Sequence, residues 1–168
     1  MRSRIQQIAA SAIILCGVVG CDVAGLNTAY TEAAANSDGL RSVQNMTAGR
    51  AAHSATLLRD GRVLVVGGMG PGETRTDSAE IFDSSSMTFT PTGRLGTARA
   101  GHTASLLPDG RVLIAGGFNG DYLQTSEIYD PKSGRFYPGP SLTVPRSEHT
   151  ATTLKDGRVL LAGGVSTG

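Results

Sequence analysis

The chain has 168 residues, a length that corresponds to one domain at most by the usual ~100–200 residues per domain. Its charged content of 17% and its formal net charge of +1 exclude a long coiled coil and a protein that binds nucleic acid through bulk positive charge. Glycine supplies 23 residues, about twice the usual share of roughly 7%, which indicates many turns and short strands.

Residues 1–20 have the pattern of an export signal. Arg2 and Arg4 precede an apolar run at 8–19, which is too short to span a bilayer but has the length of a secretory-signal core. The run ends in Val18-Val19-Gly20-Cys21, which resembles the lipobox of bacterial lipoproteins. The resemblance implies lipidation at Cys21 and a lipid-anchored location in the bacterial cell envelope, on its periplasmic or surface face. The alternative is an ordinary cleaved signal with an incidental cysteine.

The segment that follows Cys21 is predicted to be a tether. Residues 21–41 are small and polar and show no hydrophobic periodicity. A flexible segment of this length reaches about 25 Å from its anchor. We therefore expect a lipidated N-terminus and flexible tether at 21–41 and a folded part at 42–168.

The folded part repeats itself at intervals of about 50 residues. Each copy opens with Arg-x-x-His, continues through Asp-Gly-Arg into an apolar run and ends in two glycines. A second block recurs as Ser-Ala-Glu-Ile-Phe-Asp at 78–83 and Ser-Glu-Ile-Tyr-Asp at 126–130. The repeated arginine, histidine and glutamate positions are Arg50, His53, Glu80, Arg99, His102, Glu127, Arg146 and His149.

Each repeat predicts four short strands. Residues 53–58 are strand formers, and Asp60-Gly61 predicts a two-residue type I′ hairpin with positive φ at both positions. The apolar run at 63–66 predicts a strand buried on both faces. A third strand is expected at 80–82 and a fourth around Phe136 of the second repeat, so that each unit is a four-stranded antiparallel sheet.

These repeats resemble the kelch repeat, which forms one blade of a β-propeller. The resemblance covers residues 50–168, with Phe89 and Phe136 in place of the usual Trp. It implies an all-β fold of about two and a half four-stranded blades in an incomplete ring, since closed propellers need ~4–8 blades. We therefore expect a truncated chain, a strand at 40–45 that completes a blade, and self-association through the exposed edge at 159–162.

The repeated Arg, His and Glu positions are predicted to be structural. A buried Arg needs a partner, so the arginines are expected to pair with the glutamates. Equivalent positions of successive blades lie around an axis, which argues against a metal site of three histidines. The Gly-x-Ser-x-Gly pattern at 164–168 is treated as an accident of the glycine loop, and no catalytic residue or metal ligand is predicted.

No cofactor is predicted for this stretch of chain. Galactose oxidase-like relatives would imply copper and a Tyr–Cys crosslink, but no cysteine follows Cys21. Neither a phosphate-binding loop nor a basic stripe is present, so no nucleic-acid partner is expected.

The loops after the double glycines differ between repeats, and loops on a rigid scaffold commonly carry recognition. The candidate binding residues in these loops are Arg75, Asn119, Asp121 and Tyr122. We expect a membrane-anchored, non-catalytic kelch module that binds a protein or glycan in the bacterial envelope. The alternative is a fragment of a kelch-superfamily enzyme, a sugar oxidase or epimerase, whose catalytic blades are absent.

Overall fold

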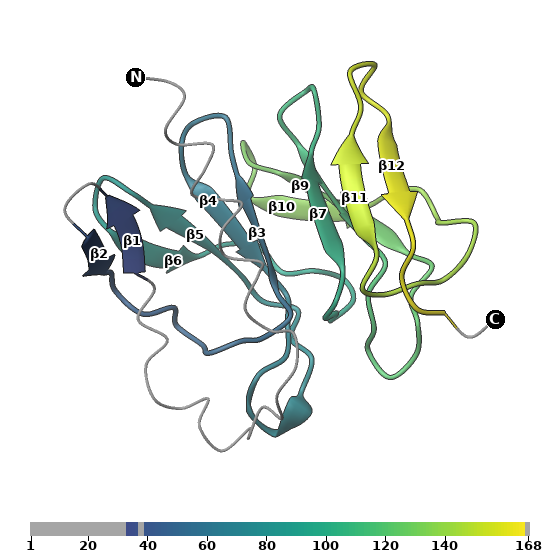
Figure 1. Cartoon of the computed structure of the whole chain (residues 1–168), viewed down its shortest axis with the longest axis horizontal. Helices are drawn as coiled ribbons and strands as arrows, with labels where there is room; N and C mark the ends of the chain where they lie inside the picture. Colours follow the sequence, from purple (N-terminus) through teal and green to yellow (C-terminus); the bar gives the residue numbers. More distant parts are fainter. Residues whose placement is uncertain (1–32, 37–38, 167–168) are drawn as a thin grey trace.

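The computed structural model describes residues 33–36 and 39–166, with strands as its main elements (Figure 1). Cys21 and the predicted export signal lie outside these residues. Within the described part of the chain, no helix is long and apolar enough to cross a membrane.

The first two repeats form the two four-stranded antiparallel sheets that the sequence predicts, and strands pair in chain order within each. The first blade consists of β3 (Ser54–Leu57), β4 (Val63–Val66), β5 (Ala79–Asp83) and β6 (Thr88–Pro91). The second blade consists of β7 (Thr103–Leu106), β8 (Val112–Ala115), β9 (Ser126–Asp130) and β10 (Arg135–Pro138). The central strand β4 is almost fully buried, as its apolar sequence indicates.

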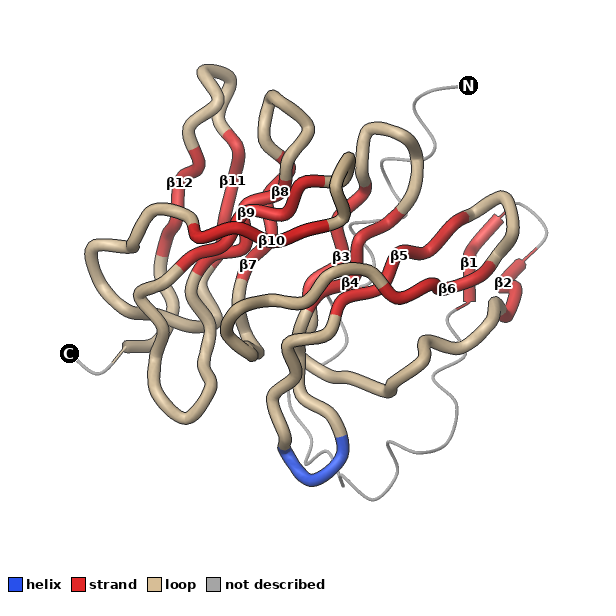
Figure 2. The backbone as a smooth tube through the Cα atoms, turned by 180° about the vertical axis from the view of Figure 1, so that it is seen from behind, coloured by secondary structure: helices blue, strands red, loops and turns tan. Residues whose placement is uncertain are grey.

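The third repeat contributes a two-stranded hairpin of β11 (Thr150–Thr153) and β12 (Val159–Ala162). The first strands of the three units, β3, β7 and β11, contact one another in order (Figure 1). The connections between first and second strands therefore share one end of the molecule. The longer loops after the glycine pairs share the other end, where a 3₁₀ turn, η3 (Pro71–Glu73), lies (Figure 2).

The predicted two-residue type I′ hairpin is wrong. The Leu58 N–H donates to the Arg62 carbonyl at 2.8 Å, so the loop has three residues, and only Gly61 within it has a positive φ, of 89°. Asp60 keeps a negative φ, and its carboxylate accepts from the Arg62 backbone N–H at 3.1 Å. The third loop position is the one that requires glycine, and the same glycine recurs at Gly110 and Gly157.

A further hairpin lies in the predicted tether. Strand β1 (Ala33–Asn36) pairs with β2 (Gly39–Ser42), so the end of the 21–41 segment carries secondary structure. The strand expected at 40–45 thus ends at Ser42, and it pairs with the residues just before it rather than completing a blade.

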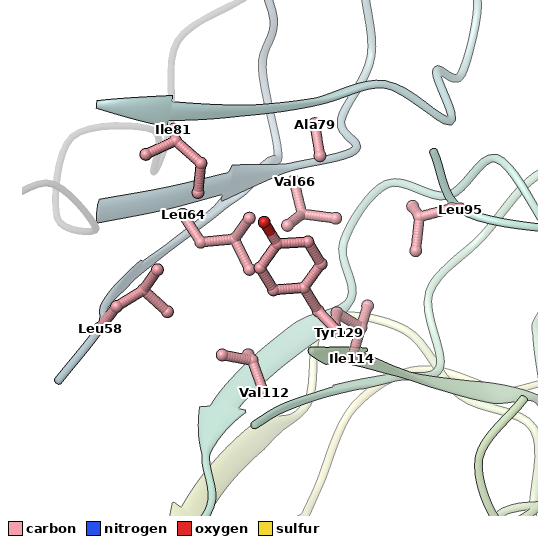
Figure 3. Packing of buried hydrophobic residues seen from close by; sticks show 9 residues of the cluster. All are labelled: Leu58, Leu64, Val66, Ala79, Ile81, Leu95, Val112, Ile114 and Tyr129. Atoms are coloured by element: carbon pink, nitrogen blue, oxygen red, sulfur yellow. The ribbon is translucent and has the colours of Figure 1, made fainter. Parts of the chain in front are cut away.

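The hydrophobic core lies between the first two blades (Figure 3). The ring of Tyr129 from β9 points between Leu64 and Val66 of the first blade and Val112 of its own blade (Figure 3). Tyr129 is 2% exposed, and its hydroxyl lies 2.8 Å from Thr92 Oγ1. Burying such aliphatic and aromatic side chains contributes about 1.5–3 kcal/mol each, so this core holds adjacent blades together.

Candidate binding site at the glycine-loop end

The glycine pair of each repeat forms the joint between neighbouring blades. The Gly68 N–H donates to the carbonyl of Arg99, in the next repeat, at 2.8 Å. A Cβ on Gly67 would lie 2.6 Å from the same carbonyl oxygen and 2.8 Å from His102 Cε1. Gly67 also has a positive φ, of 61°, which L residues rarely adopt. Only glycine lets the second repeat approach this closely, and the joint fixes how the loops of the two blades stand to one another.

The predicted Arg–Glu pairs are confirmed in both complete blades. Arg50 Nη2 lies 2.6 Å from Glu80 Oε1, and Arg99 Nη2 lies 2.9 Å from Glu127 Oε1. Arg99 also donates through Nη1 to the carbonyls of Gly116 and Thr125 at 2.8 and 3.0 Å. Burial lowers the pKa of both arginines, and the facing carboxylates oppose that effect.

The repeated histidines tie each blade to the preceding one. His102 Nε2 lies 2.8 Å from Ser54 Oγ in β3, and His149 Nε2 lies 2.9 Å from Thr103 Oγ1 in β7. Burial, assisted by the positive charge of Arg99, lowers the pKa of His102 to about 3. His102 is therefore neutral at physiological pH, as its buried structural position requires.

Two loops from different blades meet at the glycine-loop end. The guanidinium carbon of Arg75, from the β4–β5 loop, lies 5.0 Å from the centre of the Phe118 ring, in the β8–β9 loop. The Phe118 ring contacts Tyr122 edge to face, with 5.2 Å between centroids. These three side chains form one cluster, which we call the Arg75–Phe118–Tyr122 stack. Arg75 and Tyr122 were predicted as binding residues, and the structure brings them together through Phe118.

Phe118 was missed in the sequence because its equivalent in the first repeat is Met69, so internal comparison assigns no repeated role to it. Its backbone is nevertheless fixed: the Phe118 N–H donates to the Ala100 carbonyl at 2.8 Å, as the Met69 N–H does to Ala51. The signal that could have found it is its place directly after the glycine pair, where the chain is bridged to the start of the same repeat.

Asn119 and Asp121 lie at the exposed tip of the second-blade loop. The Asn119 N–H donates to the Asp121 carbonyl at 3.1 Å, and Asn119 Oδ1 accepts from the Asp121 N–H at 3.3 Å. Asn119 thus shapes the loop, and Asp121, which precedes Tyr122 in the chain, is exposed. The four predicted binding residues share one end of the molecule, and two of them, Arg75 and Tyr122, belong to the stack.

Comparison with known proteins agrees with this architecture. Residues 99–143 match the model of the Kelch motif. No curated protein matches the sequence. A solved structure of a fungal alcohol oxidase of the AA5 family, in complex with copper, is similar to this chain with a TM-score of 0.62 and 25% identity. The match covers 76% of this chain and 30% of that one, so this chain spans less than a third of its length.

The fold is therefore that of kelch-type propeller blades in an incomplete ring. The motif and the structural likeness together support the kelch and galactose oxidase-like superfamily.

The described residues do not fit the copper that the alcohol oxidase structure holds. Within residues 43–166, no three His, Cys, Asp or Glu side chains gather in a group that could hold a metal. The Nε2 atoms of His102 and His149 are engaged by hydroxyl groups of the preceding blade instead.

Proposed function

We propose that this protein is a lipid-anchored, non-catalytic interaction module of the bacterial cell envelope that binds a protein or glycan through its glycine-loop end. The observation that carries the proposal is the Arg75–Phe118–Tyr122 stack. Arginine and tyrosine are enriched among the residues that dominate binding interfaces. A cation held over an aromatic face by two rigid blades is ordered before a ligand arrives, so binding costs little side-chain entropy. The Kelch motif at 99–143 also favours an interaction module.

The binding surface is tested by comparing variants at the two ends of the blades. We expect Tyr122→Ala and Arg75→Ala to weaken binding, because each removes one member of the stack. Asp109→Ala, in the hairpin at the opposite end, is the matched control. Binding is measured on a glycan array and on immobilised envelope proteins. Equal binding by all three variants would place the ligand elsewhere on the molecule.

The proposed location in the cell envelope rests on the lipobox-like residues 18–21. Lipid attached to Cys21 would provide the membrane partner, with acyl chains contributing ~0.8 kcal/mol per buried CH₂. Metabolic labelling with a palmitate analogue should mark the wild type and leave Cys21→Ser unlabelled. Label that persists in Cys21→Ser, or that is lost only in Cys16→Ser, would overturn the assignment.

The second candidate function is part of a kelch-superfamily enzyme, a sugar oxidase or epimerase. The observation that favours it is the likeness to the copper-containing fungal alcohol oxidase. An assay for hydrogen peroxide from galactose and simple alcohols, with copper added, tests the oxidase form of this alternative. Peroxide production clearly above that of a reaction without the protein would favour the enzyme over the interaction module.

A further inference from the structure

Aspartate or asparagine followed directly by glycine occurs four times within residues 43–166. Three of these steps lie at the tips of the β3–β4, β7–β8 and β11–β12 hairpins, and the fourth lies at the tip of the β8–β9 loop. They are Asp60-Gly61, Asp109-Gly110, Asp156-Gly157 and Asn119-Gly120. At such a step the glycine nitrogen can attack the side-chain carbonyl carbon of the preceding residue, because glycine has no side chain to block the approach. Whether it does so depends on the nitrogen and on the carbonyl group at each step.

The three hairpin steps are protected at the nitrogen. The Gly61 N–H donates to the Leu58 carbonyl at 3.1 Å. In the other two hairpins, the N–H groups of Gly110 and Gly157 donate at 2.9 and 3.0 Å to the carbonyls of Leu107 and Leu154. A nitrogen held in such a turn must give up its hydrogen bond and rotate before it can attack the neighbouring side chain.

The same three steps are protected at the carboxyl group. Asp60 Oδ2 accepts from Arg62 Nη2 at 2.8 Å, and this hydrogen bonding lowers the pKa of Asp60. The same pairing and the same lowering of the aspartate pKa recur in the other two hairpins, in Asp109 with Arg111 and in Asp156 with Arg158. The three carboxyl groups are therefore ionised at neutral pH, and a carboxylate anion is a poor target for attack by nitrogen.

The Asn119-Gly120 step has neither protection. Both residues are exposed, and no described residue accepts a hydrogen bond from the Gly120 N–H. The Asn119 carboxamide is neutral, and its Oδ1 accepts from the Asp121 N–H at 3.3 Å, which draws electron density away from the carbonyl carbon. A Cβ placed on Gly120 would meet nothing within 4 Å, so the tip has room for the ring that the attack forms.

We propose that Asn119 is a site of spontaneous modification in the folded protein, where its side-chain amide is converted to aspartate or isoaspartate through a cyclic imide. The Gly120 nitrogen forms a bond to Asn119 Cγ, and the bond from Cγ to Nδ2 breaks. The proton of the Gly120 nitrogen leaves with the amide group as ammonia. Water then opens one of the two C–N bonds of the ring. No oxidant or reductant takes part, and the product carries one more negative charge than the original chain.

The modification changes the glycine-loop end of the molecule. Phe118 and Tyr122 form a bridge across the tip at 119–121, so the modified residue lies between two members of the stack. Aspartate at this position adds a carboxylate near that of Asp121 in the chain. Isoaspartate also lengthens the backbone of the tip by one carbon atom, which disturbs the pairing of Phe118 with Tyr122. An effect on ligand binding rests on the proposed function, whereas the chemistry at Asn119 does not.

Ageing the purified full chain at mildly alkaline pH, in mild detergent, tests the proposal. Mass spectrometry of its peptides should show a gain of about one dalton at Asn119, and isoaspartyl methyltransferase should label the same peptide. Asn45, which is exposed and is followed by Met46, is the internal control and should keep its amide. Gly120→Ala should slow the conversion of Asn119 about tenfold or more, because the methyl group hinders the attacking nitrogen.

Ageing in guanidinium chloride separates the effect of the fold from that of the sequence. In the denatured chain the hairpin steps lose both protections, so isoaspartate should accumulate at Asp60, Asp109 and Asp156. In the folded chain these three should stay unlabelled, while Asn119 should convert at a rate within about tenfold of its rate in the denatured chain.

Three outcomes would overturn the proposal. One is that Asn119 keeps its amide in the folded chain for as long as Asn45 does. Another is that folding slows the conversion of Asn119 by much more than about tenfold, because the loop tip would then be protected. The third is isoaspartate at Asp109 of the folded chain as early as at Asn119, because the hairpin hydrogen bonds would then give no protection. All three are measured without a ligand, so they are independent of whether the glycine-loop end binds one.

Discussion

Glu127 binds Arg99 and, with the same carboxylate, the chain segment that enters the second blade. Its Oε1 lies 2.9 Å from Arg99 Nη2 and accepts from the Thr97 N–H at 3.1 Å, while Oε2 accepts from the Gly96 N–H at 2.7 Å. In the first blade, Glu80 repeats the pattern and accepts from the Thr47 N–H at 2.8 Å. Each glutamate therefore links a third strand to the segment that leads into its own repeat.

Replacing Glu127 with glutamine should destabilise the protein. Glutamine keeps the shape but leaves the buried Arg99 charge without a carboxylate, which costs about 3–5 kcal/mol when one partner of a buried pair is removed. We expect the free energy of unfolding to fall by an amount near the lower end of that range, because the Arg99 guanidinium retains its carbonyl partners. Urea unfolding of the full chain measures the change.

The matched control for this variant is Arg146→Gln. Arg146 occupies the same repeat position and has no described carboxylate partner, so its replacement should cost under about 1 kcal/mol. Equal losses for Glu127→Gln and Arg146→Gln would mean that the ion pair is not what stabilises the blade.

The glycine joint gives a second prediction, from one substitution at two equivalent positions. Gly67→Ala places a Cβ 2.6 Å from the Arg99 carbonyl oxygen, whereas Gly163→Ala meets nothing within 4 Å. Both glycines have positive φ, of 61° and 70°, so both variants carry the left-handed backbone cost of about 1–2 kcal/mol.

Gly67→Ala should therefore be the less stable variant by about 1–3 kcal/mol, the usual cost of forcing an extra methyl group into a packed site. Chemical denaturation of the two variants side by side isolates the contact with the neighbouring blade, because the backbone cost cancels. If the two lose the same stability, the second repeat does not depend on the close approach at Gly67.

The sequence predicts most of the blade architecture because each repeat presents the same residues in the same order. The Arg–Glu pairs were predictable, since a buried charge recurring in both blades needs a recurring partner of opposite sign. The hairpin type was not predictable, because Asp-Gly fits a two-residue type I′ loop as well as a three-residue loop. The two loop types differ in which residue pairs with Arg62, and in the structure this residue is Leu58.

The binding end was only partly predictable for a similar reason. Arg75 and Tyr122 were predictable because the loops that carry them differ in sequence between repeats, and variable loops on a repeated scaffold are candidates for binding. Phe118, which joins them, lies on a loop of the second blade, and its contact with Arg75 of the first blade exists only once the joint has set the angle between blades. Internal repetition carries no information about contacts that occur once.

The core between the blades gives a third prediction, at Tyr129. Tyr129→Phe keeps the ring and leaves the Thr92 hydroxyl without its partner at 2.8 Å, which should cost about 1 kcal/mol. Tyr129→Ala empties the space among Leu64, Val66 and Val112 and should cost about 3–5 kcal/mol. Thermal unfolding ranks the variants. Equal losses for the two variants would show that the hydrogen bond, rather than packing, joins the blades, because both variants lack the hydroxyl.

The buried histidine at the blade joint makes stability depend on pH. Burial, together with the charges of Arg99, His53 and His149, lowers the pKa of His102 to about 3. An unfolded histidine has a pKa of about 6.5. Between these values the unfolded chain binds a proton that the folded chain does not, so stability falls as the pH falls through this window. Above it, both states hold neutral histidine and stability from this residue is constant.

From these two pKa values, the free energy of unfolding should fall by about 3 kcal/mol between pH 7 and pH 4.5. Burial and Arg146 also lower the pKa of His149, which adds to the loss in the same direction. The aspartates paired with Arg62, Arg111 and Arg158 have lowered pKa values, so their effect on stability comes mainly below pH 4.5.

Urea unfolding between pH 7 and pH 4.5 measures how steeply the free energy of unfolding falls with pH. His102→Gln, which can still bind Ser54 but carries no proton equilibrium, should start from a lower stability and show a much shallower slope. An unchanged slope in His102→Gln would assign the pH dependence to other groups and contradict a neutral, buried His102 at the joint.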